Sequence, residues 1–131
     1  MCIRDSSKAF DSVSHSKLIY KLAAYGLAGR LLEVMTAFLS NRFQRVIRDN
    51  VYLAYAPVIS GVPQGSVLSP LLFLLFINDI TDLFDGTVNV KLYADDIEIY
   101  FEIVHNADVD CLQKDINDLC IWAEKWQQIV Y

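Results

Sequence analysis

The sequence has 131 residues, 54% of them hydrophobic, and a formal net charge of −5 at pH 7. The length suits one modest domain or part of a larger one, and the hydrophobic content excludes a disordered chain. The longest uninterrupted apolar run, residues 71–77, is too short to cross a bilayer, and we find no secretory signal. We therefore expect an intracellular protein without a membrane partner.

The charges are unevenly distributed along the chain. Residues 1–65 contain eight Lys/Arg and four Asp/Glu, a balance of +4, whereas residues 66–131 contain three and twelve, a balance of −9. A net negative charge taken alone argues against nucleic-acid binding. The asymmetry would support nucleic-acid binding only if the basic half contacts phosphates and the acidic half holds a metal. Two solvated faces of opposite charge are the simpler alternative.

Hydrophobic periodicity and turn residues predict alternating helices and hairpins. In chain order they are two helices within 17–40 broken near Gly26, a hairpin over Phe43–Ile59 turning at Asp49-Asn50, a Gly/Pro/Ser-rich loop over 60–70, a helix starting at Ser69-Pro70 and running to about Leu83, a hairpin over 88–103, and an amphipathic helix over about 108–127. This order predicts an α+β fold in which helices pack on an antiparallel sheet.

The second hairpin contains two adjacent carboxylates, Asp95 and Asp96, in the stretch "LYADDIEIY". Two residues are a common hairpin length, but Asp-Asp lacks the glycine that such turns favour, and the two charges repel. A polar turn is the simple explanation. A divalent-metal site is the functional one, because Mg²⁺ prefers carboxylate oxygens and leaves room for substrate phosphates.

Two further segments are weak signals when each is taken alone. In "SGVPQGSVLSPLLF", Gly61 and Gly65 bracket a loop whose backbone could approach a ligand, and Gln64 adds a hydrogen-bonding amide; an ordinary helix-entry loop is the alternative. In "SSKAFDSVSHSKL", Phe10 and Asp11 precede a helix. There, Asp11 or Ser14 could simply be an N-cap.

Together and in this order, the segments resemble the reverse transcriptase of non-LTR (LINE-type) retrotransposons. "SKAFDSVSH" is similar to the end of the family's first palm motif, "SGVPQGSVLSPLLFLLFINDI" to its second motif, and "YADD" to its catalytic hairpin. "FLSNRFQRV" and "WAEKW" are similar to neighbouring segments, so the resemblance covers almost everything after Ser6. It implies that residues 1–131 form part of a polymerase domain, the palm with part of the fingers and without the thumb, whose helices lie on one face of an antiparallel sheet.

The resemblance also implies the reaction and its residues. The enzyme would be an RNA-directed DNA polymerase that uses an RNA template, a DNA primer and dNTPs. Asp95, assisted by Asp96, would share two Mg²⁺ ions, or Mn²⁺, with a first-motif aspartate that the motif spacing places at Asp5. Phe10 would be the steric gate against the ribose 2′-hydroxyl, and Gln64 in its glycine loop would contact the dNTP.

We add one expectation of our own on the basic half of the chain. The side chains of Arg42, Arg45 and Arg48 are expected to lie along template or primer phosphates.

Three departures limit the resemblance. Only four residues precede Asp5, and "MCIRDS" matches the translation of a sequencing-library adapter end, so we expect residues 1–6 to be a processing scar and Asp5 to fill its slot by coincidence. The chain ends before the family's next motif and thumb, so we expect it to be inactive alone. Ile97 stands where threonine is frequent. The alternatives are a non-catalytic relic or binding module with a palm fold, and a group II intron or retron enzyme.

Overall fold

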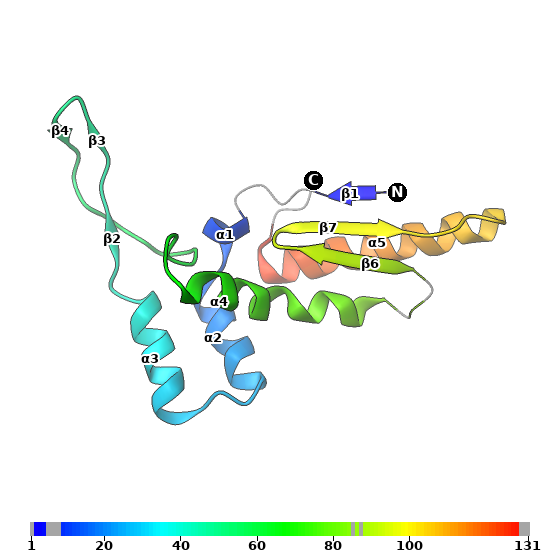
Figure 1. The fold of residues 1–131 in the computed structure, drawn as a ribbon, viewed down its shortest axis with the longest axis horizontal. Helices are drawn as coiled ribbons and strands as arrows, with labels where there is room; N and C mark the ends of the chain where they lie inside the picture. Colours follow the sequence, from blue (N-terminus) through cyan, green and yellow to red (C-terminus); the bar gives the residue numbers. More distant parts are fainter. Residues whose placement is uncertain (1, 5–8, 85, 87, 129–131) are drawn as a thin grey trace.

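The computed structural model describes residues 2–4, 9–84, 86 and 88–128, and it shows the predicted mixture of helices and small antiparallel sheets (Figure 1). The elements, in chain order, are β1 (Cys2–Arg4), α1 (Ala9–Ser12), α2 (His15–Ala24), α3 (Gly29–Leu39), β2 (Phe43–Gln44), β3 (Ile47–Arg48), β4 (Val51–Tyr52), β5 (Ala56–Pro57), α4 (Leu68–Ile77), the 3₁₀ helix η1 (Asn78–Leu83), β6 (Asn89–Tyr93), β7 (Asp96–Tyr100) and α5 (Asn106–Trp126).

The predicted break between the first two long helices is confirmed at Gly26. Its φ is +93°, a backbone conformation that glycine adopts without a steric cost. The amide of Gly26 donates to the carbonyl of Ala23, and the amide of Leu27 to that of Leu22. These two bonds satisfy carbonyls at the end of α2 and turn the chain toward α3.

Residues 43–57 form the first predicted hairpin, which we call the arm. Strand β2 pairs with β5 and β3 with β4, both antiparallel. Asp49 and Asn50 at its turn have φ values of 50° and 61°, as a two-residue turn with both central residues left-handed requires. Figure 1 shows the arm projecting from the rest of the fold, and its strand residues are exposed.

The main sheet has three antiparallel strands in the order β1-β7-β6. Strand β7 is central: Arg4 of β1 pairs with Ile97 on one side, and Leu92 of β6 pairs with the same residue on the other. The predicted second hairpin is therefore present, and β7 ends at Tyr100 rather than at residue 103.

The turn of this hairpin differs from the prediction by one residue. Tyr93 pairs with Asp96, so the turn residues are Ala94 and Asp95 rather than the two aspartates. Ala94 has a φ of 54°, the left-handed conformation for which such turns favour glycine. The alternation of apolar residues could not settle this register, because a non-glycine residue in a left-handed conformation is not visible in the pattern.

One hydrophobic core joins the hairpin to the helices. Ile97 and Ile99 on one face of β7 are buried together with Phe76 of α4 and with Leu119 and Trp122 of α5. Figure 1 shows α5 running behind the hairpin. The apolar face predicted for the last helix is confirmed, and that helix begins two residues earlier than expected.

The start of α4 also lies slightly earlier than predicted. The helix begins at Leu68, and Ser66 Oγ, rather than Ser69, accepts a bond from a helix amide, that of Ser69 at 3.1 Å. Ser69 Oγ instead donates to the carbonyl of Pro63. Val67 occupies the N-cap position without a side-chain capping bond, so Ser69 lies inside the helix rather than at its start.

None of the helices in the described part of the chain is long and apolar enough to span a membrane.

Candidate functional site

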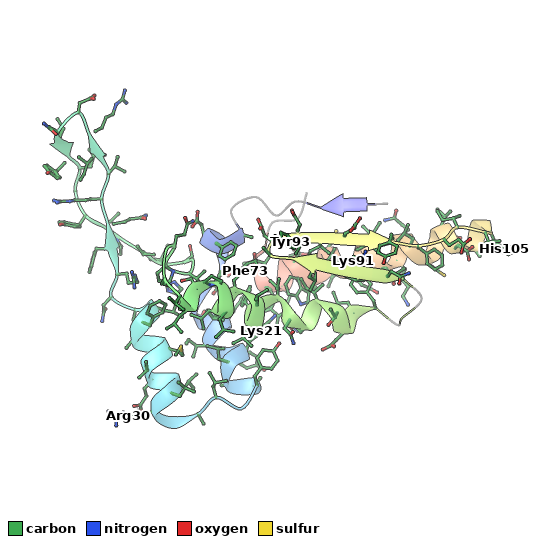
Figure 2. All side chains as sticks on the ribbon, viewed as in Figure 1. Lys21, Arg30, Phe73, Lys91, Tyr93 and His105 are labelled. Carbon is green, nitrogen blue, oxygen red and sulfur yellow. The ribbon has the colours of Figure 1, made fainter. Side chains whose placement is uncertain are left out.

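Asp95 and Asp96 lie at the turn between β6 and β7. Asp95 is a turn residue with a partly exposed side chain, and Asp96 is the exposed first residue of β7. Asp96 borders a hollow of about 460 Å³ together with its ladder partner Tyr93, which Figure 2 labels at the end of the hairpin. The hairpin thus carries two carboxylates at consecutive positions, one partly exposed and one exposed, and carboxylate oxygens are ligands of the type that Mg²⁺ prefers.

The third predicted metal ligand, Asp5, lies outside the described residues. The described segment that precedes Asp5 ends at Arg4. Arg4 pairs with Ile97, the residue that follows Asp96. Among the described residues, no group of three or more His, Cys, Asp or Glu stands close enough together to hold a metal ion. The two carboxylates that the structure describes here, Asp95 and Asp96, are thus of the chemical type that Mg²⁺ binds.

The loop that precedes α4 is bound to the N-terminal segment by a set of backbone contacts. Gly61 N donates to Val13 O at 2.8 Å, and Val62 N donates to Phe10 O at 2.9 Å. A Cβ on Gly61 would lie 2.9 Å from Asp11 Cα, closer than real Cβ atoms approach. The close backbone approach expected at this glycine is therefore made to the chain itself. Gly65, the other predicted glycine, has a φ of +78° and open space around it.

This junction brings together Gln64 and Asp11. Gln64 Nε2 donates to Asp11 Oδ1 at 2.8 Å, and Ser60 Oγ donates to the backbone carbonyl of Asp11 at 3.0 Å. Both side chains line a cleft of about 670 Å³ between α1, the base of the arm and the loop. Arg42 also belongs to its lining, although the Arg42 guanidinium donates to the carbonyl of Phe38 on α3 at 3.3 Å.

Sequence reasoning missed the contact between Asp11 and Gln64. Asp11 is a residue of the short helix α1 rather than an N-cap, and Ser14, the alternative, occupies the N-cap position of α2 without a side-chain capping bond. The partner of Asp11 lies 53 residues away in sequence. Local patterns do not report such a pairing, and the only available signal was that both residues fall in segments singled out as motifs.

Phe10, the predicted steric gate, is held by an aromatic neighbour. Its ring stacks on Phe73 of α4 with centroids 4.2 Å apart and planes 22° apart (Figure 2 labels Phe73). The residue is half-buried and packs against the core, so the stack fixes the ring while part of the residue stays exposed.

The three predicted phosphate-binding arginines do not form a single group. Arg42 lines the cleft. Arg45, on the arm, lies over the rings of Tyr52 and Tyr55, at 4.3 and 4.9 Å from their centroids. Arg48 is 88% exposed and pairs loosely with Asp49 at 3.6 Å.

Comparison with known proteins gives consistent matches. Residues 1–130 match the family model described as "Reverse transcriptase (RNA-dependent DNA polymerase)". The chain is 33% identical over 132 residues to the "RNA-directed DNA polymerase from mobile element jockey" of Drosophila funebris, covering 95% of this chain and 14% of that protein. It is 33% identical over 129 residues to the jockey protein of Drosophila melanogaster, with 93% and 14% covered.

A third relative is the "Probable RNA-directed DNA polymerase from transposon BS" of Drosophila melanogaster, 32% identical over 129 residues, with 93% of this chain and 14% of that protein covered. The chain thus spans about one seventh, 14%, of the length of these curated relatives.

Proposed function

The chain belongs to the reverse transcriptase family, and from this premise we propose that it forms the palm, with part of the fingers, of an RNA-directed DNA polymerase encoded by a LINE-type retrotransposon. The polymerase would extend a DNA primer on an RNA template with dNTPs. Support for the palm comes from the antiparallel hairpin, whose buried face shares one core with α4 and α5. The named relatives are polymerases of mobile elements, which supports the element type.

The observation that carries this proposal is the position of Asp95 and Asp96 at the exposed turn of a paired hairpin. These two carboxylates would hold Mg²⁺, with Asp5 as the third ligand. When bound, such ions activate the attacking hydroxyl and neutralise charge on the transferred phosphate. The task of the chain is to hold the carboxylates at a fixed place, and a two-residue turn between hydrogen-bonded strands does this better than a long loop would.

Phe10 and Gln64 would select and orient the dNTP. The Phe10 ring, supported from one side by Phe73, would occupy the space that a ribose 2′-hydroxyl needs. Gln64 would offer its amide to the nucleotide from the cleft, with Gly65 keeping the adjacent backbone unobstructed. Both contacts position substrate and exclude the wrong sugar without taking part in bond making.

Arg42 is the arginine best placed to meet a phosphate near this site, because it lines the same cleft as Gln64. Arg45 and Arg48 on the arm would contact the nucleic-acid backbone farther away. Such contacts supply affinity and register, and they weaken as salt rises.

The proposal is tested by Asp95→Asn in a full-length polymerase that carries this segment. We expect RNA-templated primer extension to fall by roughly 1,000-fold or more, because a charged ligand at the reaction centre is lost. We also expect the rise in melting temperature on adding Mg²⁺ to shrink, since binding to the folded state stabilises it. Asp110→Asn, on an exposed position of α5, is the matched control. Extension by Asp95→Asn at the rate of the control would refute the metal role.

A further inference from the structure

We propose that Asp11 is a positioning residue for Gln64: it sets which atom of the Gln64 amide is offered to the nucleotide. This inference rests on the proposed function, because it assumes that Gln64 contacts the dNTP. It adds a residue, Asp11, whose place in the sequence suggested only helix capping.

The geometry of the contact is well defined. Gln64 Nε2 and Asp11 Oδ1 are 2.8 Å apart, a normal charge-assisted hydrogen-bond length. The two backbones cannot move apart easily, because Ser60 Oγ donates to Asp11 O at 3.0 Å and Val62 N donates to Phe10 O at 2.9 Å. Gly61 fits against Asp11 with no room for a Cβ. The carboxylate is therefore held at a fixed place relative to the loop that carries Gln64.

The chemistry of the two groups gives the contact a direction. A glutamine amide has a donor end and an acceptor end that are nearly equal in shape, so an unsupported glutamine can present either one. A carboxylate accepts hydrogen bonds and does not donate them. Asp11 therefore attracts Nε2 and leaves Oε1 as the acceptor for a hydroxyl or N–H of the nucleotide. Both residues line the cleft of about 670 Å³, where a nucleotide could meet that oxygen.

The alternative is that the bond only ties α1 to the loop. The effect of either role should disappear when the Gln64 amide is removed, because Gln64 forms one end of the bond, and a double-mutant cycle measures that interaction. The melting temperature and kcat separate the two roles. A structural tie would lower the melting temperature of Asp11→Ala and change kcat together with KM, whereas a positioning role changes KM for dNTP and leaves the melting temperature near that of wild type.

The experiment uses a full-length polymerase that carries this segment, an RNA template and a DNA primer, and it measures kcat and KM for dNTP together with the melting temperature of each variant. The variants are Asp11→Ala, Gln64→Ala and the double variant, with Glu33→Gln, an exposed carboxylate on α3, as the matched control. We expect Asp11→Ala to raise KM roughly 3- to 10-fold, with a smaller change in kcat, because one hydrogen bond that orients the binding group is lost. Adding Asp11→Ala to Gln64→Ala should change KM no further.

Asp11→Asn supplies a second line of evidence and serves if the alanine variant folds poorly. It keeps an oxygen acceptor at the same place but adds a donor, so the Gln64 amide can adopt either orientation. We expect its KM to lie between those of wild type and Asp11→Ala.

An equal rise in KM with and without the Gln64 amide would overturn the inference, and so would no rise in the Asp11→Ala variant. A normal KM for Gln64→Ala would overturn both this inference and the nucleotide role of Gln64. That result is distinguishable from failure of the polymerase proposal itself, which Asp95→Asn tests independently.

Discussion

Phe10 illustrates how one side chain can be both packed and functional. Its ring contacts Phe73 at 4.2 Å and is only half-buried, so the core fixes its position while part of it stays available to a ligand. If this ring meets the sugar of the nucleotide, its removal should weaken sugar selection. We expect Phe10→Ala in the full-length enzyme to raise incorporation of rNTP relative to dNTP by roughly tenfold or more, because steric exclusion of the 2′-hydroxyl is lost.

The ratio of rNTP to dNTP incorporation on one template is the direct measurement. Tyr20→Ala removes an aromatic side chain that is 69% exposed on α2, and it should leave the ratio unchanged. An unchanged ratio in Phe10→Ala would mean that the ring serves only the core.

Ala94 is the strained residue next to the proposed metal site. Its φ of 54° is a conformation that costs an L-residue with a Cβ about 1–2 kcal/mol, and glycine little. We expect Ala94→Gly to raise the free energy of unfolding by about 1 kcal/mol, because the relief of strain exceeds the entropy that glycine adds to the unfolded chain. Urea unfolding of the chain measures the change.

The same substitution, alanine to glycine, should change the free energy of unfolding in the opposite direction when it is made in a helix. Ala23 is exposed within α2, so Ala23→Gly should lower the free energy of unfolding by about 1 kcal/mol. Equal losses at both positions would show that Ala94 is not strained.

At the scale of elements, the sequence was most informative where local chemistry decides the structure. Gly26 divides two helices because its φ is positive, and the Asp49-Asn50 pair closes the arm because both residues tolerate left-handed conformations. The amphipathic period predicted for the last helix matches a buried face of α5 that includes Leu119 and Ala123. In each case the residues that form the element are close together in sequence.

The sequence was less informative where distant segments meet. The hydrogen bond between Asp11 and Gln64 spans 53 residues, and the stacking of Phe10 on Phe73 depends on how α1 approaches α4. The one-residue error in the hairpin turn arose because Ala94 takes a conformation that its residue type disfavours. The candidate site was thus located by its motifs, while its internal contacts required the fold.

The start of α5 depends on one carboxylate. Asp108 Oδ2 accepts the backbone amides of His105 at 2.7 Å and Val104 at 2.8 Å, and these bonds lower the pKa of Asp108 below its ordinary value near 3.8. A lowered carboxyl pKa contributes stability above the ordinary pKa, and that stability is lost as pH falls through the lowered value. We expect Asp108→Asn to reduce the melting temperature at neutral pH.

The difference in melting temperature between wild type and Asp108→Asn should stay constant from pH 7 to about pH 5 and shrink below about pH 4. Asp118→Asn, farther along the helix, should show a smaller effect at every pH. A difference that persists unchanged to pH 3 would exclude the ionised cap.

At the scale of the whole molecule, Lys21 links four elements through the core. This residue of α2, labelled in Figure 2, is 3% exposed; its Nζ donates to Phe76 O at the end of α4 and to Asp79 Oδ1 in η1. The ammonium lies 3.8 Å from the ring centroid of Trp126 and 4.7 Å from that of Trp122, both on α5. Trp122 Nε1 donates to the same Asp79 oxygen at 3.1 Å. One buried charge therefore orients helices that meet from distant parts of the chain.

Burial lowers the pKa of Lys21 below 10.5, and the hydrogen bond and charge of Asp79 oppose that shift in part. Between the folded-state pKa and 10.5, the unfolded chain binds more protons at this residue than the folded chain does. The contribution of Lys21 to the free energy of unfolding therefore rises with pH in that window. Below the window the buried charge is a constant cost, offset by its partners.

Because of this arrangement, removing the Asp79 charge should cost more stability than removing the Lys21 charge. Asp79→Asn leaves the buried ammonium without its counter-charge, and we expect a loss of about 2 kcal/mol, less than for a fully buried pair because the Asp79 side chain is 30% exposed. Lys21→Met removes the charge and keeps an unbranched chain among the rings, so its stability should lie within about 1 kcal/mol of wild type. Urea unfolding at pH 7 and pH 10 tests both: wild type should gain stability relative to Lys21→Met as pH rises. The contrary outcome is a larger loss of unfolding free energy in Lys21→Met than in Asp79→Asn, with the same difference at both pH values. It would show that the aromatic contacts of the ammonium stabilise the fold by more than its desolvation costs.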